Sequence, residues 1–140
     1  MTHKDYRHRD VLDKLGIKPA QVVAIDDPTG RLGAELTERV RHRIGRSLAA
    51  ESEVVDVAIV MVDVSTDVVD VLTHWRGRIT SDGGIWLLTR KRGHVGYVDQ
   101  NALIAAGPAA GLVDNKVCSF SDLESALRFV IRRADRPGRR

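Results

Sequence analysis

Two adjacent carboxylates, Asp26 and Asp27, follow a short apolar run and could carry out chemistry. Neighbouring carboxylates can act as general acid and base, or bind a divalent cation. Aspartate is also a preferred residue at the start of a helix, and Pro28 is suited to a first helical position. We favour this simpler interpretation, in which Asp27 caps a helix and Asp26 is a polar residue at the end of a strand.

A cluster of cations follows a later apolar run, at Arg90, Lys91, Arg92 and, after a glycine, His94. Guanidinium and ammonium groups on such a loop can bind phosphate or carboxylate. The carboxyl ends of parallel strands meet at one edge of a sheet, where open α/β sheets bind ligands. The predicted edge also receives the polar residues that follow the neighbouring strands, namely Asp26, Asp27, Asp63, Ser65 and Thr66. We favour a solvated loop whose cations pair with those aspartates over a ligand-binding loop.

The histidines and the single cysteine show no pattern typical of a metal site or of a nucleophile. The five histidines are dispersed along the sequence. Cys118 lies in an apolar run without a histidine nearby, which indicates a buried, inert thiol. The motifs GxSxG, SxxK and GxxxxGK[ST] of common hydrolases and nucleotide-hydrolysing enzymes do not occur. We therefore expect no catalytic residue, no metal and no cofactor.

Apolar periodicity predicts alternating strands and helices in the first part of the chain. Three runs are apolar almost throughout, as is typical of strands covered on both faces in a parallel sheet. They span residues 21–25, 54–64 and 85–89. Between them, apolar residues at helical spacing predict amphipathic helices over residues 32–44 and 68–79, the second capped within residues 65–67. This order predicts parallel strands joined by right-handed crossovers.

The remaining segments predict a smaller set of elements. Residues 11–15 fit a short helix, 81–84 (SDGG) a turn, 100–106 a helix, 116–120 a fourth strand, and 127–133 an antiparallel strand with one exposed face. Ser121 and Glu124 have the spacing of a capping box for one short turn. The predicted fold is α/β, with a small three-layer Rossmann-like sheet that is mainly parallel and ends in an antiparallel strand.

Three segments carry a resemblance to a known family: KLGIKPAQVV, DGGIWLLTRKRGHVGYVDQNALIAAG and GLVDNKVCSFSDLESALRFVIRR. Together they resemble the actinobacterial family called domain of unknown function 3052, over most of residues 12–136. The resemblance implies an ordered domain in a bacterial cytoplasm, and it brings no assigned activity.

A more distant resemblance is to the class I methyltransferases that use S-adenosylmethionine. LGIKPAQVVAIDD is similar to their first strand and the segment before it, and Asp82-Gly83-Gly84 resembles the turn that enters their fifth strand. Their glycine-rich loop after the first strand is replaced by residues 26–33, which include a proline and two carboxylates. The acidic residue that ends their second strand and binds the ribose has no counterpart. The resemblance thus implies a shortened, degenerate methyltransferase-like fold without a working cofactor site.

Charge and composition narrow the classes of partner. The formal net charge is +3, but the last nine residues hold five arginines against one aspartate, so the rest of the chain is close to neutral. This distribution disfavours a nucleic-acid-binding surface on the body of the protein. The apolar runs are shorter than the roughly 18 residues of a membrane span, and the charged N-terminus does not resemble a secretory signal. We therefore expect a cytoplasmic protein without a membrane partner.

These observations predict one domain and leave several functions open. We expect a flexible segment at residues 1–11, a single α/β domain at 12–135 and a basic, disordered tail at 136–140. The favoured function is a non-catalytic regulatory or protein-binding module with an unknown protein partner. The alternatives are binding of a nucleotide or another small anion at the carboxyl edge of the sheet, and nucleic-acid binding through the arginine-rich tail.

Overall fold

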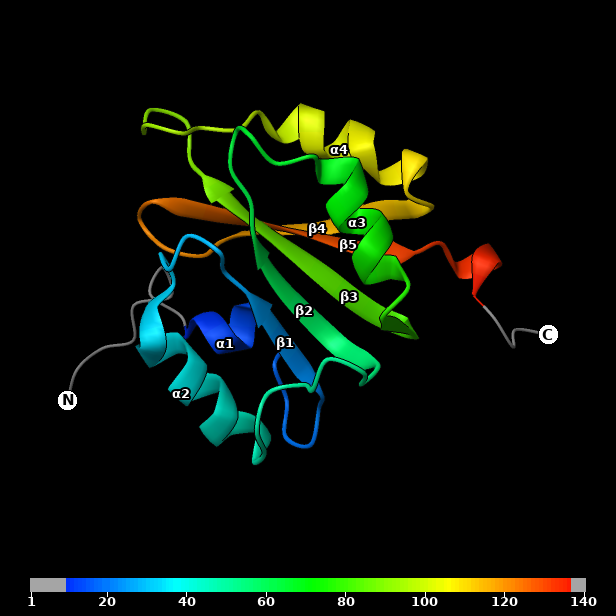
Figure 1. Cartoon of the computed structure of the whole chain (residues 1–140). Helices are drawn as coiled ribbons and strands as arrows, with labels where there is room; N and C mark the ends of the chain where they lie inside the picture. The colour runs from blue at the N-terminus through cyan, green and yellow to red at the C-terminus, as the bar shows by residue number, and fades with distance from the viewer. Residues whose placement is uncertain (1–9, 137–140) are drawn as a thin grey trace.

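Three parallel strands form the first part of the sheet in the structure, a computed structural model that describes residues 10–136 (Figure 1). They are β1 (Val23–Asp26), β2 (Val55–Met61) and β3 (Ile79–Arg90). The sheet continues through β5 (Glu124–Ile131), antiparallel to β3, and ends at β4 (Leu112–Ser119), giving the order β1-β2-β3-β5-β4. The predicted α/β fold, mainly parallel with an antiparallel C-terminal strand, is confirmed.

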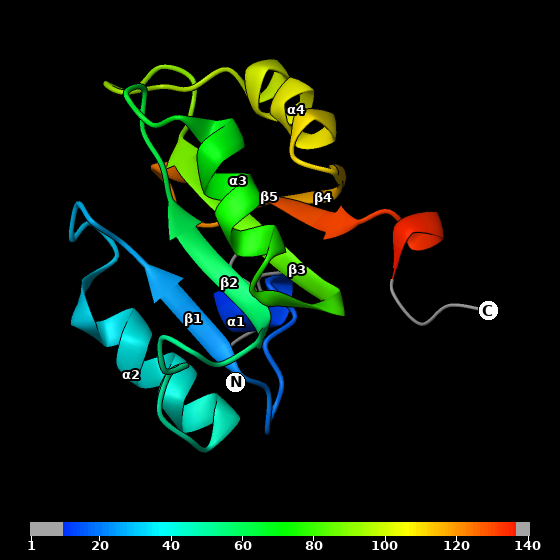
Figure 2. The same ribbon diagram turned by 45° about the vertical axis from the view of Figure 1, so that its right-hand side comes forward.

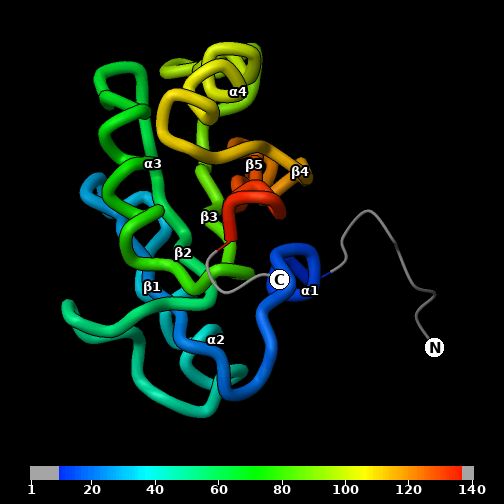
Figure 3. Tube along the Cα trace, turned by 90° about the vertical axis from the view of Figure 1, so that its right-hand side faces the viewer, coloured from blue at the N-terminus to red at the C-terminus, as the bar shows by residue number. Residues whose placement is uncertain are grey.

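Helices cover both faces of this sheet, which makes three layers (Figures 1 and 2). The helices α1 (Val11–Lys14) and α2 (Gly33–Ile44) pack on one face, and α3 (Val68–Arg76) and α4 (Gln100–Ala109) pack on the other. Figure 3 shows α1 and α3 on opposite sides of the strands. The sheet therefore separates two hydrophobic clusters.

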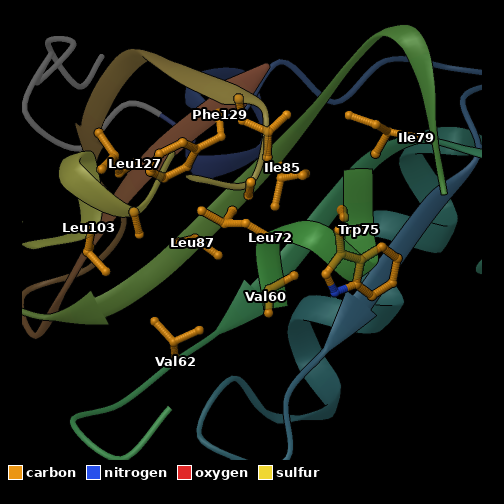
Figure 4. Packing of buried hydrophobic residues seen from close by; sticks show 14 of the residues in the cluster. Val60, Val62, Leu72, Trp75, Ile79, Ile85, Leu87, Leu103, Leu127 and Phe129 are labelled. Carbon is orange, nitrogen blue, oxygen red and sulfur yellow. The ribbon is translucent and has the colours of Figure 1, made fainter. Parts of the chain in front are cut away.

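The larger cluster lies between the sheet and the helices α3 and α4 (Figure 4). Leu72 and Trp75 of α3 and Leu103 of α4 pack there against β2, β3 and β5. The other cluster centres on Trp86, which is 1% exposed and donates its indole N–H to the carbonyl of Leu15 at 3.0 Å. This hydrogen bond attaches the end of α1 to the middle of β3.

The helices α2 and α3 form where apolar residues recur at helical spacing in the sequence. In α2, the buried residues Leu36, Val40 and Ile44 recur every fourth position, and Gly45 ends the helix with a φ of 76°, a value that favours glycine. The carboxylate of Asp67 caps α3 by accepting from the backbone N–H of Asp70 at 3.1 Å, as predicted. However, α3 ends at Arg76, and Ile79 is already the first residue of β3.

The predicted helix cap at Asp27 is wrong. The helix begins six residues later, at Gly33, and Leu32 occupies its cap position without a side-chain hydrogen bond. The Asp27 carboxylate instead accepts from the backbone N–H of Leu32 at 2.7 Å and from the hydroxyl of Thr29 at 2.8 Å. It therefore closes a turn between β1 and α2, because an aspartate can satisfy backbone donors in a turn as well as at a helix start.

The predicted turn at residues 81–84 is also wrong, because these residues lie inside the 12-residue strand β3. Its glycines make room for neighbouring atoms. A Cβ atom at Gly83 would lie 2.9 Å from the carbonyl oxygen of Asp56, and one at Gly84 would lie 2.7 Å from Cζ of Arg128. The pairing of β2 with β3 is irregular here, between Val55 and Val57. Glycine in a strand interior often marks such close approaches.

The C-terminal elements are longer and more buried than predicted. The helix α4 continues through Pro108 to Ala109, and β4 starts at Leu112. On both faces of β5 most side chains are buried, because this strand lies between β3 and β4. The prediction that one face of this strand is exposed is therefore wrong. Cys118, predicted to be buried, is only partly buried on the edge strand β4.

The ends of the chain lie mostly outside the described part. The predicted flexible segment at residues 1–11 is described only from Asp10 onward, and the basic tail at 136–140 only at Arg136, whose Nε donates to the carbonyl of Ile131 at 3.1 Å. Within residues 10–136, no helix has the length and apolar character that a membrane crossing requires.

Candidate functional site

A pocket of about 480 Å³ opens at the carboxyl end of β3, within the range of roughly 300–1,000 Å³ typical of ligand pockets. It lies between the β3–α4 connection, the first turn of α4 and the neighbouring parts of β4 and β5. Its polar lining comprises Thr89, Arg90, Lys91, Arg92, Tyr97, Asp99, Gln100, Asn101 and Ser125. Its apolar lining comprises Val98, Leu103, Val117 and Leu127. We name it the β3–α4 pocket.

The connection that forms one wall of this pocket folds back on the end of β3. The backbone of Tyr97 pairs with that of Arg90, and Gly93 and Gly96 between them have φ values of 90° and 86°. Such values favour glycine, so the spacing of the two glycines permits this compact loop. The loop places the Arg92 guanidinium 5.3 Å from the centre of the Tyr97 ring.

The predicted cations lie together in the pocket wall, but each has a different partner. The Nε atom of Arg90 donates to Oε2 of Glu124 at 2.8 Å, and Nζ of Lys91 donates to the hydroxyl of Ser119 at 2.7 Å. Arg92 contacts Tyr97 and makes no hydrogen bond to a described residue. The favoured pairing of these cations with Asp26, Asp27 and Asp63 does not occur among residues 10–136.

His94 belongs to the predicted edge but not to the pocket lining. It lies at the exposed tip of the loop, where its carbonyl accepts from the backbone N–H of Tyr97 at 3.1 Å. His94 therefore stabilises the loop through a hydrogen bond of its backbone.

Asp63, Ser65 and Thr66 form a separate turn after β2. The Asp63 carboxylate accepts from the Ser65 hydroxyl at 2.7 Å, the Ser65 backbone at 2.9 Å and the Thr66 hydroxyl at 3.2 Å. The hydrogen bonds from Ser65 lower the pKa of the Asp63 carboxyl, and the charge of Arg31 lowers it further, while partial burial acts in the opposite direction. The structure brings these residues together in a turn that satisfies its own polar groups.

Asp26 and Asp27 lie at the end of β1, the edge strand of the sheet, and line no wall of the β3–α4 pocket. Burial acts to raise the pKa of Asp27, but hydrogen bonds from the backbone of Leu32 and the hydroxyl of Thr29 lower it on balance. Asp26 is exposed. In the described part of the chain, no group of three or more His, Cys, Asp or Glu side chains could hold a metal ion.

Glu124 connects three segments at this edge, a role that the local sequence pattern does not predict. Only 7% of the residue is exposed. Besides the Arg90 cation, its carboxylate accepts from the Ser121 hydroxyl at 3.0 Å, and Nε of Arg31 lies 3.9 Å away. The spacing of Ser121 and Glu124 in the sequence does indicate that the two residues interact. In the structure they close the hairpin between β4 and β5, where the backbone N–H of Glu124 donates to the Ser121 hydroxyl at 3.0 Å.

Solved structures that are similar in fold include several methyltransferases. The chain aligns with CalO1, a methyltransferase in calicheamicin biosynthesis in its SAH-bound form, at a TM-score of 0.62 and 19% identity, over 87% of this chain and 52% of CalO1. It aligns with the pyocyanin biosynthetic protein PhzM at a TM-score of 0.63 and 7% identity, over 88% of this chain and 53% of PhzM. The chain thus spans about half the length of each.

A shorter protein gives a fuller alignment. The TehB-like SAM-dependent methyltransferase from Corynebacterium glutamicum matches at a TM-score of 0.57 and 12% identity, over 93% of this chain and 90% of that protein. At these identities the likeness concerns the fold, which is that of class I methyltransferases with a Rossmann-like sheet. No curated protein sequence matches the chain significantly. The sequence does match one family over residues 12–133, and the chain belongs to that family, described as protein of unknown function (DUF3052).

Proposed function

We propose that this protein is a non-catalytic binding module on a methyltransferase-like fold, and that it binds a small anionic molecule with an apolar portion in the β3–α4 pocket. The observation that carries the proposal is the placement of Lys91 and Arg92 in the wall of a ligand-sized pocket at the carboxyl edge of the sheet. This is the edge at which open α/β sheets bind ligands.

The unused donors of the pocket support an anionic ligand. A lysine ammonium has three donors and an arginine guanidinium has five. The Nζ atom of Lys91 makes one hydrogen bond and Arg92 makes none among residues 10–136, so both retain donors for an oxyanion. The N-terminus of α4 adds a partial positive charge to the same pocket through its dipole. Asp99 is the opposing charge in the lining, and its carboxylate already accepts from the backbone of Asn101 at 2.9 Å.

The other walls support an apolar portion of the ligand. Leu103 and Leu127 of the lining are nearly fully buried, and the Tyr97 ring lies beside the Arg92 guanidinium. Aromatic and aliphatic side chains with a few polar groups are the usual lining of small-molecule pockets. A ligand that joins an oxyanion to a ring or a short aliphatic group would match both parts of this lining.

A protein partner at the same edge is a second candidate, supported by two exposed aliphatic side chains. Val64 is 72% exposed after β2 and Val95 is 93% exposed after β3. The two loops that carry them extend from the same end of the sheet (Figures 1 and 2). A regulatory module could present these loops to a protein and alter their arrangement when the pocket is filled.

Phenyl phosphate, which joins a ring to an oxyanion, is a suitable first probe. In a titration of the ¹⁵N-labelled full chain followed by NMR, we expect saturable shifts at the backbone amides of Lys91, Arg92 and Gln100. The double variant Lys91→Ala/Arg92→Ala should weaken binding by about tenfold or more, since charge-assisted hydrogen bonds are lost. Shifts confined to other parts of the molecule, or unchanged affinity in the double variant, would overturn the proposal.

The matched control is Arg41→Ala/Arg132→Ala, which removes the same charge from exposed positions outside the pocket. It should retain the affinity of the unmodified protein. If both double variants lose affinity equally, the effect is one of net charge, and the assignment to the pocket fails. Native mass spectrometry of the purified protein provides an independent test, because a retained anion should dissociate from the Lys91→Ala/Arg92→Ala variant.

A further inference from the structure

Arg128 of β5 lies on the opposite face of the sheet from its neighbour Leu127, which lines the β3–α4 pocket. It stands opposite Trp86 in the pairing of β5 with β3, and its guanidinium extends diagonally over Gly84. A Cβ atom at Gly84 would lie 2.7 Å from both Cζ and Nη2 of Arg128. The second glycine of the Asp82-Gly83-Gly84 motif therefore provides the space that the guanidinium occupies.

The guanidinium is partly buried but has no partner within residues 10–136. Arg128 makes neither a hydrogen bond nor an ion pair there, although arginines that leave water are usually paired. Burial lowers the pKa of Arg128, and the nearby charge of Arg136 lowers it further. The neighbouring Arg136, in contrast, donates from Nε to the carbonyl of Ile131 at 3.1 Å.

A second cation stands beside it. Lys116 of β4 is directly opposite Arg128 in the antiparallel pairing, so the two side chains lie on the same face of the sheet. Like charges in this position destabilise a sheet. Neither Lys116 nor Arg128 has an acidic partner within ion-pair distance among the described residues, so an anion bound between them would relieve their repulsion.

Both cations line a pocket of about 280 Å³ between the end of α1 and the amino ends of β2 and β3, which we name the Arg128 pocket. Its charged lining comprises Lys18, Lys116, Arg128, Asp56 and Asp82. Each carboxylate has one oxygen engaged: Asp56 accepts from the backbone N–H of Val22 at 2.8 Å, and Asp82 accepts from the hydroxyl of Thr80 at 3.2 Å. Each retains an oxygen that can accept from a ligand.

We propose that the Arg128 pocket binds a small carboxylate that also carries a hydroxyl or amino group. The planar guanidinium matches a carboxylate through two parallel hydrogen bonds, and the ammonium of Lys116 adds a second charge. Asp56 and Asp82 would repel a second anionic group, but they accept hydrogen bonds from a hydroxyl or ammonium group. The small volume excludes large ligands. This site is independent of the β3–α4 pocket and of the function proposed for it.

Lactate and propionate form a matched pair of probes, because they differ only in the hydroxyl group. In NMR titrations of the ¹⁵N-labelled full chain, lactate should shift the amides of Gly83 and Gly84 and the indole N–H of Trp86 saturably. Propionate should do so with severalfold lower affinity. The indole of Trp75, on the other face of the sheet, serves as an internal reference. Absence of saturable shifts with both probes overturns the site, and equal affinity overturns the role of the hydroxyl.

Variants of Arg128 and Lys116 test whether these two cations bind lactate. Arg128→Gln should abolish the shifts caused by lactate, and Lys116→Gln should weaken binding severalfold. Arg132→Gln, which removes the same charge from an exposed position just after β5, should bind as the unmodified protein does. Lys116 lies on an edge strand with exposed residues, so its variant tests the proposal even if Arg128→Gln fails to fold. Unchanged lactate affinity in Lys116→Gln, or in a folded Arg128→Gln, overturns the proposal.

The two pockets can be tested separately. The amides of Lys91, Arg92 and Gln100 report on the β3–α4 pocket, while those of Gly83 and Gly84 report on the Arg128 pocket. If lactate shifts only the first set of signals, the further site is wrong and the proposed function gains support. If phenyl phosphate fails at the β3–α4 pocket but lactate binds beside Arg128, only the proposed function is wrong.

Discussion

At the scale of single residues, Asp27 shows how a side chain can serve backbone donors outside a helix. The sequence predicts that Asp27, before Pro28, caps a helix. In the structure its carboxylate instead accepts the hydrogen bonds that close a turn. The carboxylate accepts from the backbone of Leu32 at 2.7 Å, so the connection from β1 to α2 depends on its negative charge. Hydrogen bonds of this kind stabilise the ionised form of the carboxyl group.

This arrangement predicts a pH dependence for Asp27→Asn. The pKa of Asp27 is lowered from the ordinary value of 3.8, so the carboxylate stabilises the fold fully above that value. The contribution is lost as the pH falls through the folded-state pKa. Urea unfolding should therefore show Asp27→Asn less stable than the unmodified protein at about pH 7, with a smaller difference near about pH 2. Asp26→Asn, at an exposed position, is the control; a constant difference across this range would contradict the assignment.

At the scale of elements, Glu124 joins the end of β3 to the β4–β5 hairpin and approaches the loop after β1. Its carboxylate accepts hydrogen bonds from the Arg90 guanidinium and the Ser121 hydroxyl, and Nε of Arg31 lies 3.9 Å away. A hydrogen bond between the backbone of Lys91 and the carbonyl of Leu123, at 2.8 Å, strengthens the same junction. The wall of the β3–α4 pocket thus depends on a buried carboxylate that lies outside its lining.

We expect Glu124→Gln to destabilise the protein by about 1–3 kcal/mol, because it leaves the Arg90 cation without its charged acceptor. The amide is nearly the same size as the carboxylate, so little of the loss would come from packing. Denaturant unfolding measures the effect, and Glu35→Gln on the exposed face of α2 is the matched control. A loss no larger than in the control would show that the junction is held by the hairpin backbone alone.

The pairing of β4 with β5 leads to a prediction of the opposite sign. Lys116 and Arg128 are directly opposite like charges, so Lys116→Gln should stabilise the ligand-free protein by roughly 0.2–1 kcal/mol. The gain should shrink at high salt, because salt screens the repulsion. Thermal unfolding of the dialysed protein at two salt concentrations is the measurement. A destabilised variant would show that Lys116 makes a favourable contact stronger than this repulsion.

At the scale of the whole molecule, the sequence predicted the elements better than their junctions. The strands β1, β2 and β3 and the helices α2 and α3 follow from apolar runs and helical spacing, which are local patterns. The contact of Arg128 with Gly84 and the pairing of Arg90 with Glu124 depend on cross-strand register between segments more than 30 residues apart. Register is set by the assembled sheet. For this reason the local pattern alone predicts a turn at the glycine pair and a local cap at Glu124.

The sheet order predicts how the whole protein responds to S-adenosylmethionine. In doubly wound sheets the ligand crevice lies where the strand order reverses, with strands on both sides. Here β1 is the edge strand, and the outward carbonyl of Val23 accepts from the backbone N–H of Ala49 at 2.9 Å, so the α2–β2 connection occupies the place of a further strand. The Asp27 turn fills the region after β1 with its own hydrogen bonds.

We therefore expect calorimetric titration of S-adenosylmethionine into the full chain to show no binding tighter than about 100 µM, which corresponds to roughly −5.5 kcal/mol. CalO1, a methyltransferase of the same fold with a structure in its SAH-bound form, is the positive control for the titration. If the chain binds more tightly than this limit, Asp27→Gly distinguishes two explanations. Stronger binding in that variant would mean that the turn after β1 partly obstructs a cofactor site, whereas unchanged binding would place the cofactor away from β1 and overturn the link between sheet order and cofactor loss.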